Sequence, residues 1–104
     1  MANPRIEPLK KVLAIDPNDD VAWFGLGKAY MADSNWEEGM GALERCIQTN
    51  PSYSAAYFSL AECLKHLSRF DQCKQVCDQG IEISTKNGDA MVTKNLGILK
   101  DSLG

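Results

Sequence analysis

The sequence lacks any long apolar run, and it also lacks a cluster of basic residues. No stretch approaches the roughly 20 apolar residues that span a bilayer, so no membrane insertion is expected. The N-terminal segment MANPRIEPLKK has no apolar centre, so no secretory signal is expected. The 11 Lys and Arg residues are dispersed and the net charge is −3. Nucleic acid binding is therefore not expected, because phosphate recognition needs clustered cations.

The residue types that enzymes use for chemistry are also scarce. The sequence holds one histidine, His66, and no nucleophile motif accompanies it. The nearest Gly-rich segment, GLGK at 25–28, lacks the spacing of a phosphate-binding loop. We therefore expect no enzymatic activity and no cofactor. Four cysteines without a secretory signal indicate reduced thiols, and the expected location is the cytoplasm.

An internal repeat of 34 residues fills most of the chain. Residues 20–53 align with residues 54–87 without a gap, and the type of side chain is retained at most of the apolar positions. The matched pairs are Trp23 with Tyr57, Phe24 with Phe58, Leu26 with Leu60, Gly27 with Ala61, Tyr30 with Leu64, Trp36 with Phe70 and Leu43 with Cys77. This period is typical of stacked helical pairs, which bury their apolar stripes only against neighbouring pairs.

Each repeated unit is predicted to contain two amphipathic helices. In the first helix, Trp23, Leu26, Gly27 and Tyr30 follow the i, i+3, i+4, i+7 spacing of a buried stripe. Polar breaks at 32–35 and 66–69 separate the two helices of each unit. The first unit ends at Asn50-Pro51, because a residue before proline avoids helical geometry. The second unit is expected to end near 85–88.

The segment WFGLGKAY at 23–30 resembles the signature W-x2-L-G-x2-Y of the tetratricopeptide repeat (TPR) family. The second unit matches more loosely, with Tyr57, Leu60, Ala61 and Leu64 at these positions. The resemblance implies an all-α solenoid of stacked antiparallel helix pairs, with about six helices in one domain over residues 1–104. The expected parts are a partial N-terminal helix at 4–15, repeat 1 at 20–53, repeat 2 at 54–87 and a C-terminal capping helix at 88–103. In that last helix, Lys94 and Asn95 are expected at the Leu-Gly positions.

The same alignment predicts the core and accounts for the cysteines. The expected core residues are Trp23, Leu26, Gly27, Tyr30, Trp36, Leu43, Tyr57, Leu60, Ala61 and Phe70. The spacing C-x2-H-x6-C-x3-C, formed by Cys63, His66, Cys73 and Cys77, raises the question of a zinc site. Zinc needs four convergent ligands, and Cys63 is expected to point toward the preceding repeat. We therefore interpret the cysteines as small apolar core residues and expect no metal.

What the resemblance implies for function is a non-enzymatic protein–protein interaction module, an adaptor or scaffold. The family generally holds a peptide or helix of another protein in the groove formed by the first helices. The expected groove residues are Val21, Phe24, Lys28, Met31, Ala55, Phe58, Glu62, Lys65, His66, Val92 and Leu96. Phe24 and Phe58 are expected to lie side by side there. They could form an exposed platform, or they could pack on each other or under the ends of the chain.

Two further expectations concern the partner. Some TPR proteins grip a C-terminal carboxylate with Lys, Asn and Arg side chains, but the matching positions here are Phe24, Lys28, Ser59, Asp89 and Thr93. Only Lys28 is positive, so this type of binding is disfavoured. The alternative function is a self-associating scaffold, such as a homodimer, because residues 91–99 (MVTKNLGIL) form a helix that is apolar on more than one side.

Overall fold

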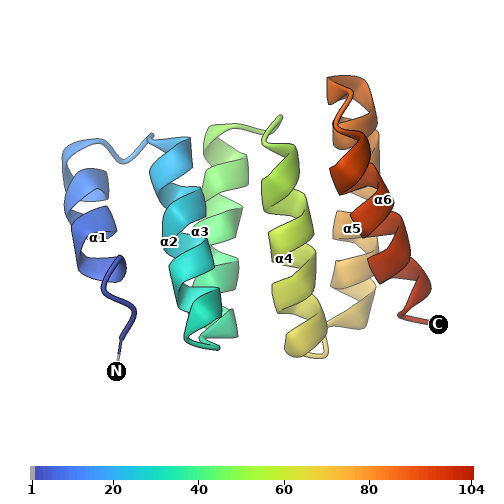
Figure 1. Cartoon of the computed structure of the whole chain (residues 1–104), viewed down its shortest axis with the longest axis horizontal. Helices are drawn as coiled ribbons and strands as arrows, with labels where there is room; N and C mark the ends of the chain where they lie inside the picture. Colours follow the sequence, from blue (N-terminus) through green and yellow to red (C-terminus); the bar gives the residue numbers. More distant parts are fainter. Residues whose placement is uncertain (1) are drawn as a thin grey trace.

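Six α-helices and no strand form the part of the chain that the computed structural model describes, residues 2–104. The helices are α1 (Ile6–Ile15), α2 (Asp20–Ala32), α3 (Trp36–Thr49), α4 (Ser54–His66), α5 (Phe70–Asn87) and α6 (Ala90–Asp101). Successive helices run in opposite directions, with α3 and α5 behind α2, α4 and α6 in the view of Figure 1. The predicted all-α solenoid of stacked antiparallel pairs is confirmed.

α2 begins and α3 ends where the capping and proline signals in the sequence predict. Asp19 caps α2, because its carboxylate accepts a hydrogen bond of 3.0 Å from the backbone N–H of Ala22. α3 ends at Thr49, two residues before Pro51. In the turns between paired helices, Ser34 and Ser68 both adopt a left-handed backbone with φ of 59°. The repeat therefore extends to the backbone conformation of its turns.

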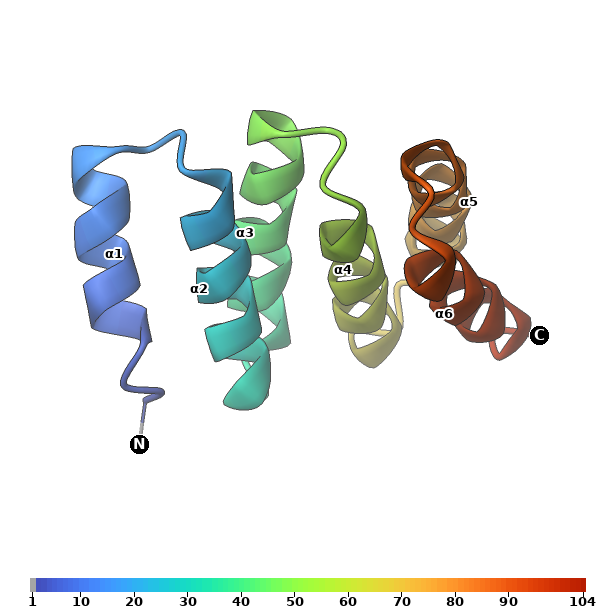
Figure 2. The same cartoon turned by 45° about the horizontal axis from the view of Figure 1, so that its top comes forward.

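The last helix departs from the 34-residue period. α5 continues to Asn87 because Thr85 stands where Pro51 would stop it, and Gly88 then ends the helix with φ of 71°. α6 begins at Ala90, so its register is shifted by two residues, and Figure 2 shows it tilted relative to α4. Leu96 and Gly97 consequently occupy the Leu-Gly positions.

This shift corrects the expectation that Lys94 and Asn95 take the Leu-Gly positions. At the Leu position of the signature, the three first helices carry Leu26, Leu60 and Leu96, which are 4%, 5% and 0% exposed. Lys94 is exposed and Asn95 is half-buried. The outward side of α6 is thus set by where α5 ends, and a constant repeat length cannot predict it.

Most of the expected core residues lie inside the molecule. Leu26, Gly27, Leu43, Tyr57, Leu60 and Ala61 are buried, and Trp23, Tyr30 and Trp36 are half-buried. Phe70 is wrong as a core residue, because it is 47% exposed. Its counterpart Trp36 stacks on the ring of His66 in the next unit, with centroids 3.8 Å apart. At the shifted register, the residue corresponding to His66 is Ser102, just after α6, which has no ring for Phe70 to stack on.

A close approach of two helices fixes the spacing within the first pair. A Cβ atom added at Gly27 would lie 2.7 Å from Cγ of Leu43, which is itself fully buried. Glycine therefore permits a distance between α2 and α3 that any larger residue would increase. Gly41 and Gly97, which are also inside helices, have no atom within 4 Å of an added Cβ.

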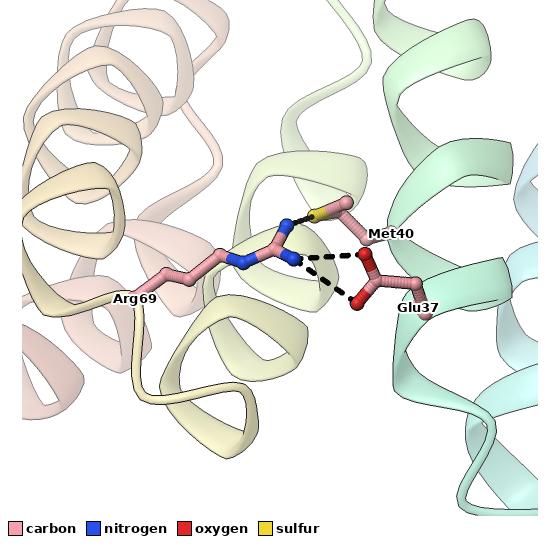
Figure 3. A network of polar contacts seen from close by, with 3 residues as sticks. All are labelled: Glu37, Met40 and Arg69. Carbon is pink, nitrogen blue, oxygen red and sulfur yellow. Dashed lines mark hydrogen bonds and ion pairs between the residues drawn. The ribbon is translucent and has the colours of Figure 1, made fainter.

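A surface network joins the two repeated units on the side of the second helices. Figure 3 shows Arg69, in the turn before α5, reaching Glu37 and Met40 of α3. Its Nη2 donates to both carboxylate oxygens of Glu37, at 2.8 and 3.2 Å, and its Nη1 lies 3.1 Å from the sulfur of Met40. Both charged side chains are substantially exposed, so the ion pair contributes about 1 kcal/mol at most.

Gly27→Ala should destabilise the protein, whereas Gly41→Ala should not. The added methyl group at position 27 must displace the buried Leu43, which costs about 1–3 kcal/mol. At position 41 there is room for the methyl group, and the better helix propensity of alanine should add about 0.5–1 kcal/mol. Urea unfolding of both variants beside wild type measures the difference. Equal stabilities would show that the two helices are not in close contact at Gly27.

Leu96→Ala and Ile98→Ala test the shifted register of α6. Leu96 is fully buried, so its truncation should cost about 2–5 kcal/mol. Ile98 is 59% exposed, so its truncation should change stability by less than about 0.5 kcal/mol. Thermal unfolding followed by circular dichroism compares the two variants. A larger loss for Ile98→Ala would contradict the two-residue shift.

Candidate functional site

Two adjoining hollows lie between α4 and α6, and together we call them the α4–α6 groove. The first, of about 230 Å³, is lined by Phe58, Lys65, Asn95, Ile98, Leu99 and Ser102. The second, of about 410 Å³, is lined by Glu62, Lys65, His66 and Leu99. Lys65 and Leu99 line both hollows, so the two adjoin on the side of the first helices.

The helical period gathers these side chains on facing sides of the two helices. Phe58, Glu62 and Lys65 follow i, i+4, i+7 along α4. Asn95, Ile98 and Leu99 lie on α6, and Ser102 directly follows its last residue. Phe58 and Leu99 are half-buried and also touch the core, whereas Ile98 is 59% exposed. The groove therefore offers apolar surface held by buried neighbours.

Charged groups lie at the edge of this apolar surface. Lys65 Nζ donates a hydrogen bond of 3.0 Å to Oγ of Ser102, which links α4 to α6. Glu62 and His66 lie along the same edge, so both signs of charge are present. Because His66 also stacks on Trp36, its ring lies between the groove and the adjoining unit. An apolar segment flanked by polar residues suits such a surface.

The groove residues expected on α2 are spread between surface and core. Val21 is 63% exposed, while Lys28 and Met31 are half-buried. Phe24 stacks on Tyr53, with centroids 5.0 Å apart, so its ring partner is this residue and not Phe58. Ala55 at the start of α4 is also half-buried.

Two residues expected in the groove lie elsewhere. Leu96 is fully buried, and its Cδ1 would lie 2.6 Å from a Cβ added at Gly80, so it belongs to the core. Val92 is half-buried and packs against the same core. The physical reason is the two-residue shift of α6, which turns Asn95 and Ile98 toward the groove. The sequence signal that could have revealed this is Thr85, where the preceding unit has proline.

The shift also changes the positions that would hold a carboxylate in the family. Met91 and Asn95 replace Asp89 and Thr93 at these positions, and neither is cationic. Asp89 instead accepts a hydrogen bond of 2.9 Å from Oγ of Ser54. Lys28 remains the one cation in the set, so the arrangement does not favour a carboxylate.

A further hollow of about 510 Å³ was not predicted from the sequence. Side chains of α1, α2 and α3 line it, among them Leu13, Trp23, Tyr30, Gly41 and Arg45. The guanidinium of Arg45 lies 5.0 Å from the ring centroid of Trp23, within range of a cation–π contact. The corresponding hollow of the second unit is lined by Gln75, Val76 and Gln79, and these side chains take up part of its space. Smaller residues line the hollow of the first unit, which accounts for its larger volume.

All four cysteines are free thiols in the core. Cys73 Sγ donates to the carbonyl oxygen of Ala61 at 3.2 Å. Burial raises the pKa of Cys46, Cys63 and Cys77 to about 12, and it raises the pKa of Cys73 as well. Within residues 2–104, no three His, Cys, Asp or Glu side chains are grouped to hold a metal ion. Thiolate chemistry is therefore disfavoured in the folded protein.

No helix within the described residues combines the length and apolarity needed to cross a membrane.

Stability should fall as the pH rises from about 9 to about 12. In the unfolded chain the thiols ionise near their ordinary pKa of 9.0, while burial keeps three of them protonated to about 12. The unfolded state therefore releases protons first, which lowers stability by up to about 1.4 kcal/mol per pH unit for each thiol. Urea unfolding at stepped pH measures this slope, and Cys77→Ala should reduce it. A flat profile between pH 9 and 11 would contradict the assignment of protected thiols.

Comparison with known proteins agrees with the type of repeat that the sequence signature indicates. A sequence profile for the tetratricopeptide repeat matches residues 42–75. A TPR repeat-containing protein of Pseudomonas aeruginosa is 29% identical over 93 residues, which cover 89% of each chain. Superkiller protein 3 of Saccharomyces cerevisiae is 36% identical over 78 residues, but these cover 71% of this chain and 5% of that protein.

Solved structures share the fold at low sequence identity. The TPR2B domain of yeast Sti1, in complex with pHsp70, has a TM-score of 0.89 and 11% identity, and the match covers 94% of this chain and 78% of that chain. The first TPR of Spaghetti, bound to the HSP90 peptide SRMEEVD, has a TM-score of 0.78 and 19% identity, with 94% and 76% covered. Together with the 34-residue period and the paired helices, the matching profile and these likenesses support a small tetratricopeptide repeat protein.

Proposed function

We propose that this chain is a non-enzymatic interaction module that binds an apolar peptide or helix of another protein in the α4–α6 groove. TPR domains are protein–protein interaction modules, and structural neighbours have been solved with chaperone peptides bound. The observation that supports the proposed place is that two hollows adjoin at Lys65 and Leu99, which line both.

The chemistry of the groove supports a partner with apolar anchors. Phe58 and Leu99 are half-buried against the core, so they need little reordering to accept an apolar side chain. Ile98 adds exposed apolar area beside them. Large apolar residues held in place by a core are typical anchors of interfaces.

Charge at the edge of the groove supports a partner with polar flanks of both signs. Lys65 would pair with an acidic residue of the partner and Glu62 with a basic one, which contributes more to orientation than to affinity. The hydrogen bond from Lys65 to Ser102 must open or be shared when an acidic residue binds. A helix with one apolar face or an extended peptide fits this description.

A peptide like the SRMEEVD bound to Spaghetti is not the proposed partner. Such an acidic peptide presents several carboxylates, and here Lys28 is the one cation at the positions expected to bind a carboxylate. We propose the cytoplasm as the location, because the four cysteines of the described chain form no disulfide.

Selection from a library of displayed peptides, followed by affinity measurement, tests this proposal. Wild type should enrich peptides with two or more spaced apolar residues. The double variant Phe58→Ser/Ile98→Ser should bind the selected peptides at least about tenfold more weakly, because both anchors are lost. Isothermal titration calorimetry with synthetic peptides gives the affinities, and circular dichroism checks that the variant is folded.

Phe70→Ser is the matched control. It also removes an aromatic side chain that is 47% exposed, but it lies outside the α4–α6 groove, so binding should stay unchanged. Equal weakening by Phe70→Ser and by the groove variant would place the binding surface elsewhere. Peptides that bind a folded groove variant as tightly as wild type would reject the proposed site.

A further inference from the structure

The two terminal helices of the described chain each lack the neighbour that inner helices have. In the first unit, α2 pairs with α3, and in the second, α4 pairs with α5. α6 has the sequence character of a first helix, but no second helix follows it within residues 2–104. α1 corresponds to a second helix, and no first helix precedes it there.

Burial shows which side of α1 is left open. The buried or half-buried positions of α3 include Gly39, Ala42, Cys46 and Thr49. The residues 34 positions earlier are Arg5, just before α1, and Pro8, Val12 and Ile15 of α1, and all four are exposed. Ile15 is 88% exposed, although it is a large apolar residue.

Gly97 lies on the side of α6 that no other helix covers within residues 2–104. Gly27 of α2 corresponds to Ala61 of α4 and, with the shift of two residues, to Gly97. At Gly27 an added Cβ would lie 2.7 Å from Leu43 of the paired helix. At Gly97 nothing lies within 4 Å. The space that a second helix fills beside α2 is therefore open beside α6.

We propose that α6 of one copy pairs with α1 of a second copy, so that copies of the chain assemble head to tail through a composite helix pair. The occupant of the open side of α6 is thus the exposed stripe of α1. This inference does not depend on the α4–α6 groove.

Transfer of the contacts of the inner pairs onto this composite pair tests its fit. The contact of Gly27 with Leu43 becomes Gly97 with Leu9 of the second copy, so a small residue again faces a leucine. Within one chain Leu9 is half-buried, whereas Leu43 is fully buried. The small-against-large match is retained, and Leu9 would gain the cover that it lacks.

A second transferred contact pairs opposite charges. Cγ of Met31 would lie 3.3 Å from a Cβ added at Gly39. The corresponding residues are Asp101 on α6 and Arg5, just before α1, of the second copy. Neither belongs to the four ion pairs formed within residues 2–104, so both are available to each other. Opposite charges at this position favour the head-to-tail arrangement over other registers.

A third transferred contact concerns the start of α6. Asn50, just after α3, donates to Asp20 at the start of α2, with Nδ2 and Oδ2 2.8 Å apart. By the same antiparallel geometry, the last turn of α1 would lie near Ala90. A hollow of about 360 Å³ opens there, lined by Ser84, Thr85, Gly88, Asp89, Ala90, Thr93 and Lys94. The exposed Ile15 would reach this hollow and bury its side chain.

Head-to-tail contact uses different surfaces on the two copies, so it does not close after two copies. Sedimentation equilibrium of the wild-type chain, from about 10 μM to about 1 mM, should show an average mass that rises past that of a dimer. A mass that stays monomeric over this range, or that stops at a dimer, would overturn the proposal.

Gly97→Leu should block assembly without disturbing the fold. Both Gly97 and Gly41 lie inside helices with open space at the Cβ position, and leucine favours helix. Gly97→Leu would clash with Leu9 of the second copy and should weaken association at least about tenfold. Gly41→Leu is the matched control and should assemble like wild type. Equal behaviour of the two variants would overturn the proposed contact.

Charge exchange gives a test that loss of folding cannot imitate. Arg5→Glu and Asp101→Arg should each weaken self-association at least about tenfold, because like charges then meet at the contact. An equal mixture of the two variants should assemble, because position 101 of each variant then carries the charge opposite to that at position 5 of the other. Assembly of either variant alone at wild-type strength, or a mixture that stays monomeric, would overturn the proposal.

Discussion

The close approach of paired helices is the constraint on which the rest of the molecule depends. Gly27 lets Leu43 enter the space between α2 and α3, and Gly80 lets both Tyr57 and Leu96 pack against α5. No helix here can bury its apolar stripe alone, so each contact of this kind fixes the place of the next helix. The groove follows from this packing, because its floor residues, Phe58 and Leu99, also pack against the core.

The composition of the groove depends on where one helix ends. Thr85 does not stop α5, so α5 gains a turn, and α6 then starts two residues late. A first helix in the regular register would present Val92 and Leu96 to the groove, and α6 presents Asn95 and Ile98 instead. A single position outside the groove thus selects which side chains a partner meets, without altering any residue of the groove itself.

The helices and their pairing could be predicted from the sequence because the signals are local and repeated. Proline at 51, Asp19 as a cap and the spacing of Trp23, Leu26 and Tyr30 each act within a few residues. The errors concern residues whose surroundings come from distant parts of the chain. Phe70 is exposed because Ser102, just after α6, stands where a ring like that of His66 would be needed. Phe24 stacks on Tyr53 and not on Phe58. The hollow beside Gly41 was missed because open space leaves no sequence pattern.

Both proposals depend on α6, and this couples them. α6 has one fully buried residue, Leu96, so it is held less firmly than the inner helices. A peptide between α4 and α6 would stabilise the packed position of α6, and so would a second copy that covers Gly97. Whatever binds only the packed form raises its population, so each event lowers the cost of the other. Groove binding and assembly use opposite sides of the same helix, and we therefore expect them to reinforce each other.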